Sequence, residues 1–139
     1  MDYQKFVDDC NKRSANTLME TLQIRYTSAA EGELVATMPV TPQHHQPMGL
    51  LHGGASAAIA ESVGSAASQM FISSAKEEIR GIELSCNHLR SKTDGMVTAT
   101  AKIVHKGRTL HLWEIKITDE ENRLVSLCRL TNIVLERKI

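Results

Sequence analysis

The sequence predicts an α+β fold in which a curved antiparallel sheet wraps around one long central helix. Two observations carry this prediction. Residues 54–73 contain no proline and place apolar side chains close to helical spacing. From Lys76 onward the pattern changes to alternating apolar and polar residues, which is typical of strands with one buried face. A helix that precedes such strands buries its apolar surface against the sheet that they form.

The chain before the helix predicts short helices, a hairpin and a loop. Apolar residues in the first twenty positions recur at irregular helical spacing, which favours one short helix or two: Phe6, Val7, Cys10, Leu18 and Met19. Residues 23–27 and 33–39 alternate around the turn pair Glu31-Gly32 and predict a hairpin. Residues 43–49 have no period, and the prolines and glycine there indicate a loop.

The predicted helix, Gly54 to Ser73, is about 30 Å long. Most of its side chains are alanine, serine or glycine, so neighbouring backbone can approach closely. We therefore expect the helix to be wrapped on most sides.

Four strands are expected after the helix, with three turn segments between them. Their alternating residues are Ile82, Leu84 and Cys86, then Val97 to Ile103, then His111 to Ile117, then Val125 and Leu127. The turn segments are residues 93–95, 106–108 and 119–122, and they favour an antiparallel meander. Such a sheet leaves edges open, so we expect pairing into a dimer.

Composition limits the class of protein. The 139 residues suit one domain, residues 1–139, and the 42% apolar and 23% charged residues are typical of a globular protein. Lys and Arg number 16, as do Asp and Glu, so no whole-chain field favours nucleic acid or an anionic membrane. The start is acidic and polar and no long apolar run occurs, which predicts a soluble, cytoplasmic protein. Three widely spaced cysteines predict buried or half-buried thiols.

The densest group of reactive side chains lies in residues 46–54, followed by Glu61 and, one helical turn later, Ser65. Glu61 is a carboxylate in a helix otherwise built of small and apolar residues. It either solvates a wet face or lies at a ligand cavity or subunit interface, and the cost of burying a charge without a partner favours the second interpretation. Desolvation there would also strengthen its basicity.

The start of the helix offers further candidates. Backbone N–H groups of Gly53 and Gly54 could bind a developing oxyanion, although a glycine pair also suits a tight loop. His52 either orients a thioester carbonyl or the loop itself, or satisfies a neighbouring backbone carbonyl at the helix start. Together with His44 and His45 it lacks the spacing and the carboxylate of usual zinc signatures, so we expect no metal. No serine-hydrolase elbow or phosphate-binding loop is present.

Residues 46–56, with 61–65 behind them, resemble the signature of hotdog-fold thioesterases. The chain is most similar to the PaaI-like branch that contains the Arthrobacter-type 4-hydroxybenzoyl-CoA thioesterase, together with thioesterases for aryl-CoA and 1,4-dihydroxy-2-naphthoyl-CoA. Similarity runs from about residue 33 to residue 135. Residues 81–91 resemble the family strand beside the CoA groove, and Thr131-Asn132 resembles the closing strand.

This resemblance implies a role for each matching residue. Glu61 is then the catalytic carboxylate, the Gly53 N–H polarises the thioester carbonyl, Gln46 and His52 position substrate or water, and Ser65 assists at the carboxylate. The active site would lie at a dimer interface, with two dimers forming a tetramer.

The CoA half of the substrate would bind near residues 81–91, the segment that resembles the family strand beside the CoA groove. The candidates for contacts with acyl-CoA are Gly54, Met48, His88, Arg90, Ser91 and Arg108, of which the arginines suit CoA phosphates. For Arg108, and less so for Arg90, ordinary exposed turn charge is the alternative. Met48 stands where relatives often carry an aromatic residue, and residues 69–71 fall in a region that lines the acyl pocket; both departures leave the acyl group open and the chemistry intact.

The reaction implied is thioester hydrolysis without a metal or organic cofactor. Glu61 either activates water as a general base or attacks the carbonyl to give a mixed anhydride, and both routes stay open. An aromatic acyl-CoA is the first expected substrate; medium-chain or 3-hydroxyacyl-CoA and a carrier-protein thioester are alternatives. A non-catalytic acyl-thioester binding protein needs no carboxylate at Glu61, and a hydratase needs an Asp and His pair that does not stand out.

Overall fold

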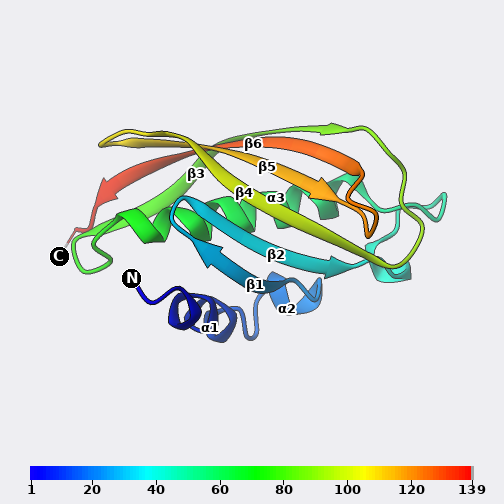
Figure 1. Cartoon of the computed structure of the whole chain (residues 1–139), viewed down its shortest axis with the longest axis horizontal. Helices are drawn as coiled ribbons and strands as arrows, with labels where there is room; N and C mark the ends of the chain where they lie inside the picture. Colours follow the sequence, from blue (N-terminus) through cyan, green and yellow to red (C-terminus); the bar gives the residue numbers. More distant parts are fainter. Residues whose placement is uncertain (139) are drawn as a thin grey trace.

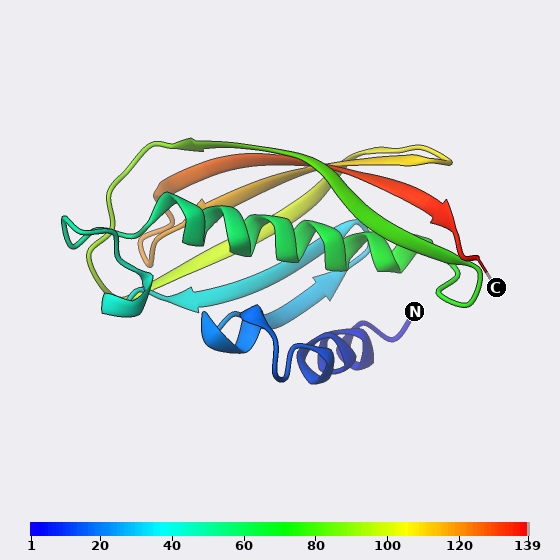
Figure 2. The same cartoon turned by 180° about the vertical axis from the view of Figure 1, so that it is seen from behind.

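The computed structural model describes residues 1–138 and contains one six-stranded antiparallel sheet (Figures 1 and 2). The α-helices are α1 Tyr3–Arg13, α2 Leu18–Thr21 and α3 Gly53–Ser68, and the short 3-10 helices are η1 Pro42–His44 and η2 Gln69–Phe71. The strands are β1 Arg25–Ala30, β2 Glu33–Pro39, β3 Glu77–His88, β4 Met96–Lys106, β5 Leu110–Thr118 and β6 Leu124–Glu136. The domain predicted over residues 1–139 includes residue 139, which lies outside the described part.

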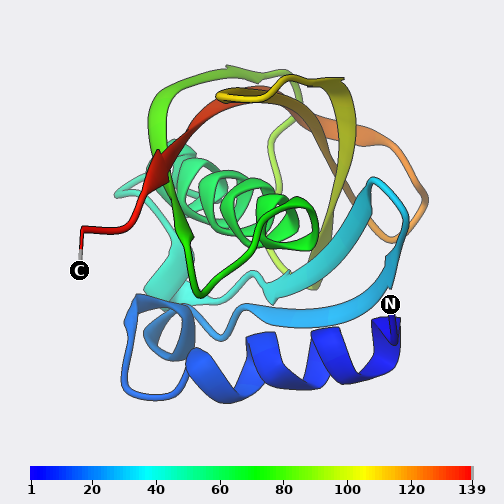
Figure 3. The ribbon, with the colours of Figure 1, turned by 90° about the vertical axis from the view of Figure 1, so that its left-hand side faces the viewer.

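The sheet curves around α3, as the end-on view in Figure 3 shows. Alternating residues of β2, β4, β5 and β6 point inward and are fully buried, and they meet the helix face formed by Ile59, Ala60, Val63 and Ala67. The predicted α+β hotdog architecture, a curved sheet around one central helix, is therefore confirmed.

The strand order, β1-β2-β4-β5-β6-β3, corrects one prediction. Strands β4, β5 and β6 form consecutive antiparallel hairpins, as expected. Strand β3 instead pairs with β6. The segment 89–95 then crosses past β6 and β5 to reach β4. The meander prediction was wrong here because residues 93–95 favour a turn but do not specify which strands the turn joins. As a result β3 is a long edge strand.

Helix α3 ends earlier than predicted. The α-helix runs from Gly53 to Ser68 and continues only as the 3-10 turn η2. Phe71 then packs on the core, with its ring centroid 6.0 Å from that of Trp113. This contact lies just beyond the end of the α-helix and is tertiary, so periodicity along the sequence does not predict it. The predicted hairpin is confirmed as β1 and β2, with Gly32 at φ +69° in the turn.

The C-terminal end of α3 is anchored by Ser68. Its buried hydroxyl oxygen accepts hydrogen bonds from Trp113 Nε1–H at 2.7 Å and from the Asn132 side-chain amide at 2.8 Å. Since both lone pairs are then used, the hydroxyl proton is donated to Nδ1 of His111, 3.0 Å away. Burial, followed by the nearby Lys106 cation, lowers the pKa of His111 and keeps its ring neutral.

The N-terminal segment is tied to the sheet and to α3. Helix α1 begins after Asp2, whose carboxylate accepts the Lys5 N–H, and it packs on β1. Asn11 exchanges two hydrogen bonds of 2.9 Å with the Tyr26 backbone, and the Tyr26 hydroxyl donates to the Ser62 carbonyl at 3.1 Å. Helices α1 and α2 therefore have a fixed place beside α3.

Cys10 and Cys128 are buried and Cys86 is half-buried, as predicted.

Within residues 1–138 we find no helix with both the length and the apolarity needed to span a membrane.

Candidate active site

One face of α3 borders an open groove of about 550 Å³. The groove is lined by Leu18, Gly54, Ala57, Ala58, Glu61, Ser62 and Ser65. The prediction that the helix is wrapped on most sides was wrong for this face, because the sheet of a single chain covers only the opposite side. Alanine and serine leave space here, so the small-residue composition forms a groove instead of a buried contact.

Glu61 lies in this groove with its side chain exposed. Within residues 1–138 its carboxylate has no hydrogen-bond or ion-pair partner. The oxygen Oε1 rests against β3, where a Cβ on Gly81 would lie only 2.7 Å from it. The same Cβ would lie 3.6 Å from Oδ1 of Asn132. A glycine at position 81 therefore gives the carboxylate its place, and Ser65 lies in the same groove one turn away.

The N-terminus of α3 leaves one backbone donor free. His52 is the N-cap residue, and its Nδ1 accepts the Gly54 N–H at 2.7 Å. The His52 carbonyl accepts from Ala55 and Ser56. In the described part of the chain the Gly53 N–H has no acceptor, so it is available for a ligand oxygen.

The same cap sets the tautomer of His52. Because Nδ1 accepts a hydrogen bond, the neutral ring carries its proton on Nε2 and can donate it outward. The histidine does satisfy a backbone group, as the structural alternative held, but the group is an N–H and not a carbonyl. One side chain therefore both caps the helix and offers a donor beside Gly53.

The loop before α3 is a tight turn. The Gln46 N–H donates to the Leu50 carbonyl at 2.8 Å, and the Gln46 side-chain oxygen accepts the Met48 N–H. Met48 is at the tip, 82% exposed, and does not line the groove of its own chain. Gln46 is half-buried, and its side-chain oxygen is committed to the turn.

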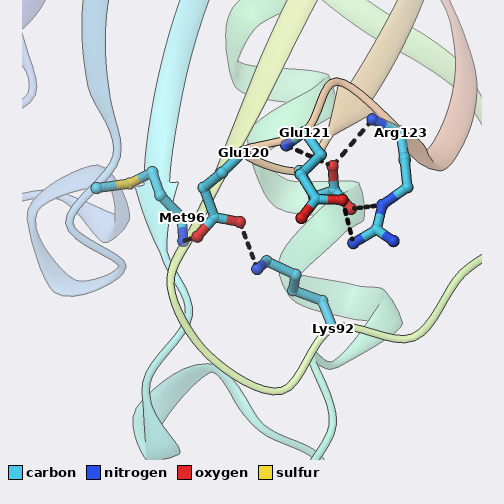
Figure 4. Close-up of polar contacts among 6 residues, drawn as sticks. Lys92, Met96, Glu120, Glu121 and Arg123 are labelled. Atoms are coloured by element: carbon cyan, nitrogen blue, oxygen red, sulfur yellow. Dashed lines mark hydrogen bonds and ion pairs between the residues drawn. The ribbon is translucent and has the colours of Figure 1, made fainter.

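The crossover segment 89–95 holds this loop, and a charged cluster holds the crossover (Figure 4). The Lys92 carbonyl accepts the Leu51 N–H at 2.8 Å, while its ammonium contacts Glu120 at 2.5 Å. The Lys92 hydrogen bond lowers the pKa of Glu120, which also accepts the Met96 N–H. Asp119 accepts hydrogen bonds from Arg123 that lower the pKa of this carboxyl and fix the adjoining turn.

His88, at the end of β3, lies over the start of α3. Its Nδ1 is 2.8 Å from the Ser126 hydroxyl, and a Cβ on Gly53 would lie 2.8 Å from its Nε2. Arg90 and Ser91 follow on the exposed crossover. This motif therefore sits at the same helix end as the free Gly53 N–H.

Arg108 is not brought to this group within one chain. It lies in the β4–β5 hairpin, whose neighbouring Lys106 has its ammonium 4.4 Å from the centroid of the Phe71 ring, at the other end of α3. Any contact of Arg108 with the same substrate molecule would have to come from another subunit.

His44 and His45 hold backbone groups in place. His44 is buried; its Nδ1 accepts the Thr41 N–H at 3.2 Å and its Nε2–H donates to the Leu22 carbonyl at 2.7 Å. His45 Nε2 bonds the Thr93 carbonyl at 2.7 Å. Among residues 1–138 no cluster of three or more His, Cys, Asp or Glu side chains could hold a metal ion.

Sequence reasoning missed three residues of this region. Gly81 begins the motif of residues 81–91, but no role was predicted for it from the sequence. A glycine inside a strand pattern is a signal that another group approaches the backbone closely, and here that group is the Glu61 carboxylate. Ser126 had no signal, because its pairing with His88 depends on the β3–β6 register. Leu18 was placed in a helix, but its position beside Glu61 depends on the tertiary fold.

A curved antiparallel sheet around one central helix is the hotdog fold. Residues 48–126 match the family model described as Thioesterase superfamily, and the chain belongs to that family. It is therefore an enzyme that hydrolyses thioesters.

Relatives agree with this assignment. The crystal structure of a mutant thioesterase from Pseudomonas aeruginosa is similar with a TM-score of 0.92 and 37% identity, covering 94% of each chain. A thioesterase from Haemophilus influenzae has a TM-score of 0.89 and 36% identity, covering 94% of this chain and 90% of that one. A 1,4-dihydroxy-2-naphthoyl-CoA hydrolase from Listeria monocytogenes is 41% identical, covering 87% of this chain and 98% of the relative.

Proposed function

We propose that the protein hydrolyses an aromatic acyl-CoA, such as 1,4-dihydroxy-2-naphthoyl-CoA, to the free acid and CoA, with Glu61 as the catalytic carboxylate. The observation that carries this proposal is the unpaired Glu61 carboxylate in an open groove along α3, whose lining begins at Gly54, the residue after the free Gly53 N–H. Acyl-CoA thioesterase activity is characteristic of the family to which the chain belongs.

In this mechanism the thioester carbonyl oxygen accepts a hydrogen bond from Gly53 N–H, with His52 Nε2–H as a second donor. Both donors strengthen as negative charge develops on that oxygen, so they favour the transition state over the ground state. Gly53 and Glu61 of one chain are eight residues apart on α3, about 12 Å along its axis, so the carboxylate at this carbonyl would be Glu61 of the partner subunit. It either takes a proton from the attacking water, or attacks the carbonyl to give a mixed anhydride that water then hydrolyses; in both routes CoA thiolate leaves. Ser65 and Gln46 position water or substrate from the groove and the loop.

The CoA half would extend from the start of α3 across the end of β3. Gly54 and His88 border the start of the helix, and Arg90 and Ser91 follow on the exposed crossover. Arginine matches the geometry of phosphate oxygens, so Arg90 would bind a CoA phosphate. Arg108 would contribute from a neighbouring subunit of a homo-oligomer, a dimer or a dimer of dimers, in which Met48 also approaches the partner's acyl pocket.

The choice of an aromatic acyl group is supported by the Listeria relative named for dihydroxynaphthoyl-CoA. Medium-chain and 3-hydroxyacyl-CoA and carrier-protein thioesters are the alternatives, because the open groove has no side chain that excludes them. A menaquinone-pathway role and a cytoplasmic location follow from the same proposal.

The test is thiol release from benzoyl-CoA, dihydroxynaphthoyl-CoA, hexanoyl-CoA and palmitoyl-CoA by the wild type and by Glu61→Ala. We expect turnover that ranks the aromatic substrates first and that falls at least about 100-fold in the variant, the usual scale for losing a general base. Wild-type turnover retained by a folded Glu61→Ala protein would refute the role of Glu61. A protein that binds these thioesters without cleaving them would be an acyl-thioester binding protein, and hydration of an enoyl-CoA would indicate a hydratase.

A further inference from the structure

The groove that holds Glu61 has a second wall, contributed by the N-terminal segment. Leu18 of α2 lines the groove opposite the small side chains Ala57 and Ala58, and it is 61% exposed despite its large apolar side chain. Exposing a leucine to water is unfavourable unless a ligand or partner covers it. Leu18 therefore gives the groove an apolar side close to the reacting carboxylate.

A second groove of about 440 Å³ continues along the same helix. It is lined by Ala66 of α3 and Gln69 of η2, which follow Ser62 and Ser65 of the first groove along the same face, and by Thr17 and Met19, the neighbours of Leu18. Tyr26, whose hydroxyl donates to the Ser62 carbonyl, also lines this second groove. At 1.5 Å per residue, Gln69 lies about 12 Å beyond Glu61 along the helix axis.

The far end of the second groove is polar and cationic. Arg13 of α1 and Arg137 line it, and no aspartate or glutamate does. Within residues 1–138 Arg13 has no ion pair; its guanidinium donates only to the Cys10 sulfur, at 3.6 Å. The guanidinium of Arg137 is 3.9 Å from Glu78. The groove thus begins apolar beside Glu61 and ends at an arginine that is free to bind an oxygen acceptor.

We propose that the α1–α2 segment is the acyl-specificity wall, with Leu18 contacting the acyl group near the thioester and Arg13 binding an oxygen substituent at its far end. The wall then favours acyl groups, aromatic or aliphatic, that are apolar next to the thioester and carry a hydroxyl or carboxylate at their far end. This inference rests on the proposed thioesterase site. The family match begins at residue 48, so it does not include this wall.

Leu18 is tested by changing its size. Leu18→Trp narrows the groove and should lower kcat/KM for octanoyl-CoA at least about tenfold while leaving acetyl-CoA, which does not reach α2, within twofold. Leu18→Ala should widen the groove and move the optimum toward bulkier acyl groups. Acyl profiles unchanged in both variants would overturn the inference, as would a change in sedimentation behaviour that shows Leu18 to be a subunit contact. If one of these two results is found while the wild type still hydrolyses the thioesters, the inference about Leu18 fails but the proposed function stands.

Arg13 is tested with matched substrates of equal length: octanoyl-CoA, 8-hydroxyoctanoyl-CoA and the CoA thioester of octanedioic acid. The wild type should prefer the two oxygen-bearing substrates, and Arg13→Gln should reduce that preference about tenfold, the scale of one charge-assisted hydrogen bond. The control is Lys12→Gln, which removes a neighbouring exposed cation that does not line the groove. An equal effect of both variants, or no preference in the wild type, would contradict a role of Arg13. A greater loss for the diacid than for the hydroxy acid would identify a carboxylate as the favoured substituent.

Discussion

At the scale of single residues, the site depends on what surrounds Glu61 as much as on Glu61 itself. The carboxylate can lie against β3 only because Gly81 has no side chain. The Gly53 N–H is free because the first N–H of a helix has no intrahelical acceptor and the His52 side chain caps Gly54 instead. Each of these features can be altered with a small change to the chain.

Gly81→Ala should displace the carboxylate, because the new Cβ would lie 2.7 Å from Oε1 of Glu61. The contacting atom is the end of a flexible side chain, so stability should change little while kcat falls at least about tenfold. Activity and thermal unfolding are measured together, with Ser85→Ala on the exposed part of the same strand as the control. Unchanged kcat in Gly81→Ala would show that this position of Glu61 is irrelevant to turnover.

Substitutions of His52 separate capping from catalysis. Asparagine is a good N-cap residue, so His52→Asn should retain stability, whereas His52→Ala should lose about 1 kcal/mol. Both variants lack the Nε2–H donor and should lose activity to a similar extent. Urea unfolding and thioester turnover check this, and a fully active His52→Asn enzyme would limit His52 to capping.

At the scale of elements, the sequence predicted the small-residue helix, the first hairpin and the β4–β6 strands, because each follows from local periodicity. It did not predict that β3 pairs with β6, since turn residues do not specify strand partners. The same limit explains why Glu61, Gly53 and His52 were found as a group, while Ser126 and Leu18 were not. Their positions depend on sheet register and on how α2 lies beside α3.

The anchor at the end of α3 predicts a pH dependence. Burial, together with the Lys106 and His105 charges and against that of Glu77, lowers the pKa of His111 in the folded state below its ordinary value of 6.5. Between these two pKa values the unfolded chain binds more protons than the folded protein. The contribution of His111 to the free energy of unfolding is therefore fully present above pH 6.5 and is lost as the pH falls toward the folded-state pKa. The free energy of unfolding should then fall by up to about 1.4 kcal/mol per pH unit for this one proton.

His111→Gln removes this titration but keeps an oxygen that can accept the Ser68 hydroxyl. Urea unfolding between pH 7 and pH 5 should therefore show a shallower decline in the variant than in the wild type. Identical slopes would show that His111 does not contribute to the pH dependence.

At the scale of the whole molecule, a single chain leaves three features incomplete. The groove beside Glu61 is open, Arg108 lies at the wrong end of α3, and β3 is a long edge strand with Ile82 56% exposed. Association of two chains through β3 would cover the edge and bring a second chain to the site.

Ile82→Lys places a charge on the exposed edge and should weaken that association. We expect the wild type to sediment as a dimer or tetramer, and the variant to shift toward monomer with a parallel loss of thioester turnover. A monomeric wild type with full activity would contradict the proposed subunit interface.

The central claim is that the Glu61 carboxylate drives thioester hydrolysis, and the most direct measurement compares Glu61→Gln with the wild type on one aroyl-CoA under single-turnover conditions. Glutamine keeps the size of the side chain but has no carboxylate to act as base or nucleophile. We predict that the amide variant folds and binds substrate as the wild type does, but that its rate of thiol release falls at least about 100-fold. A single-turnover rate equal to that of the wild type would contradict the account.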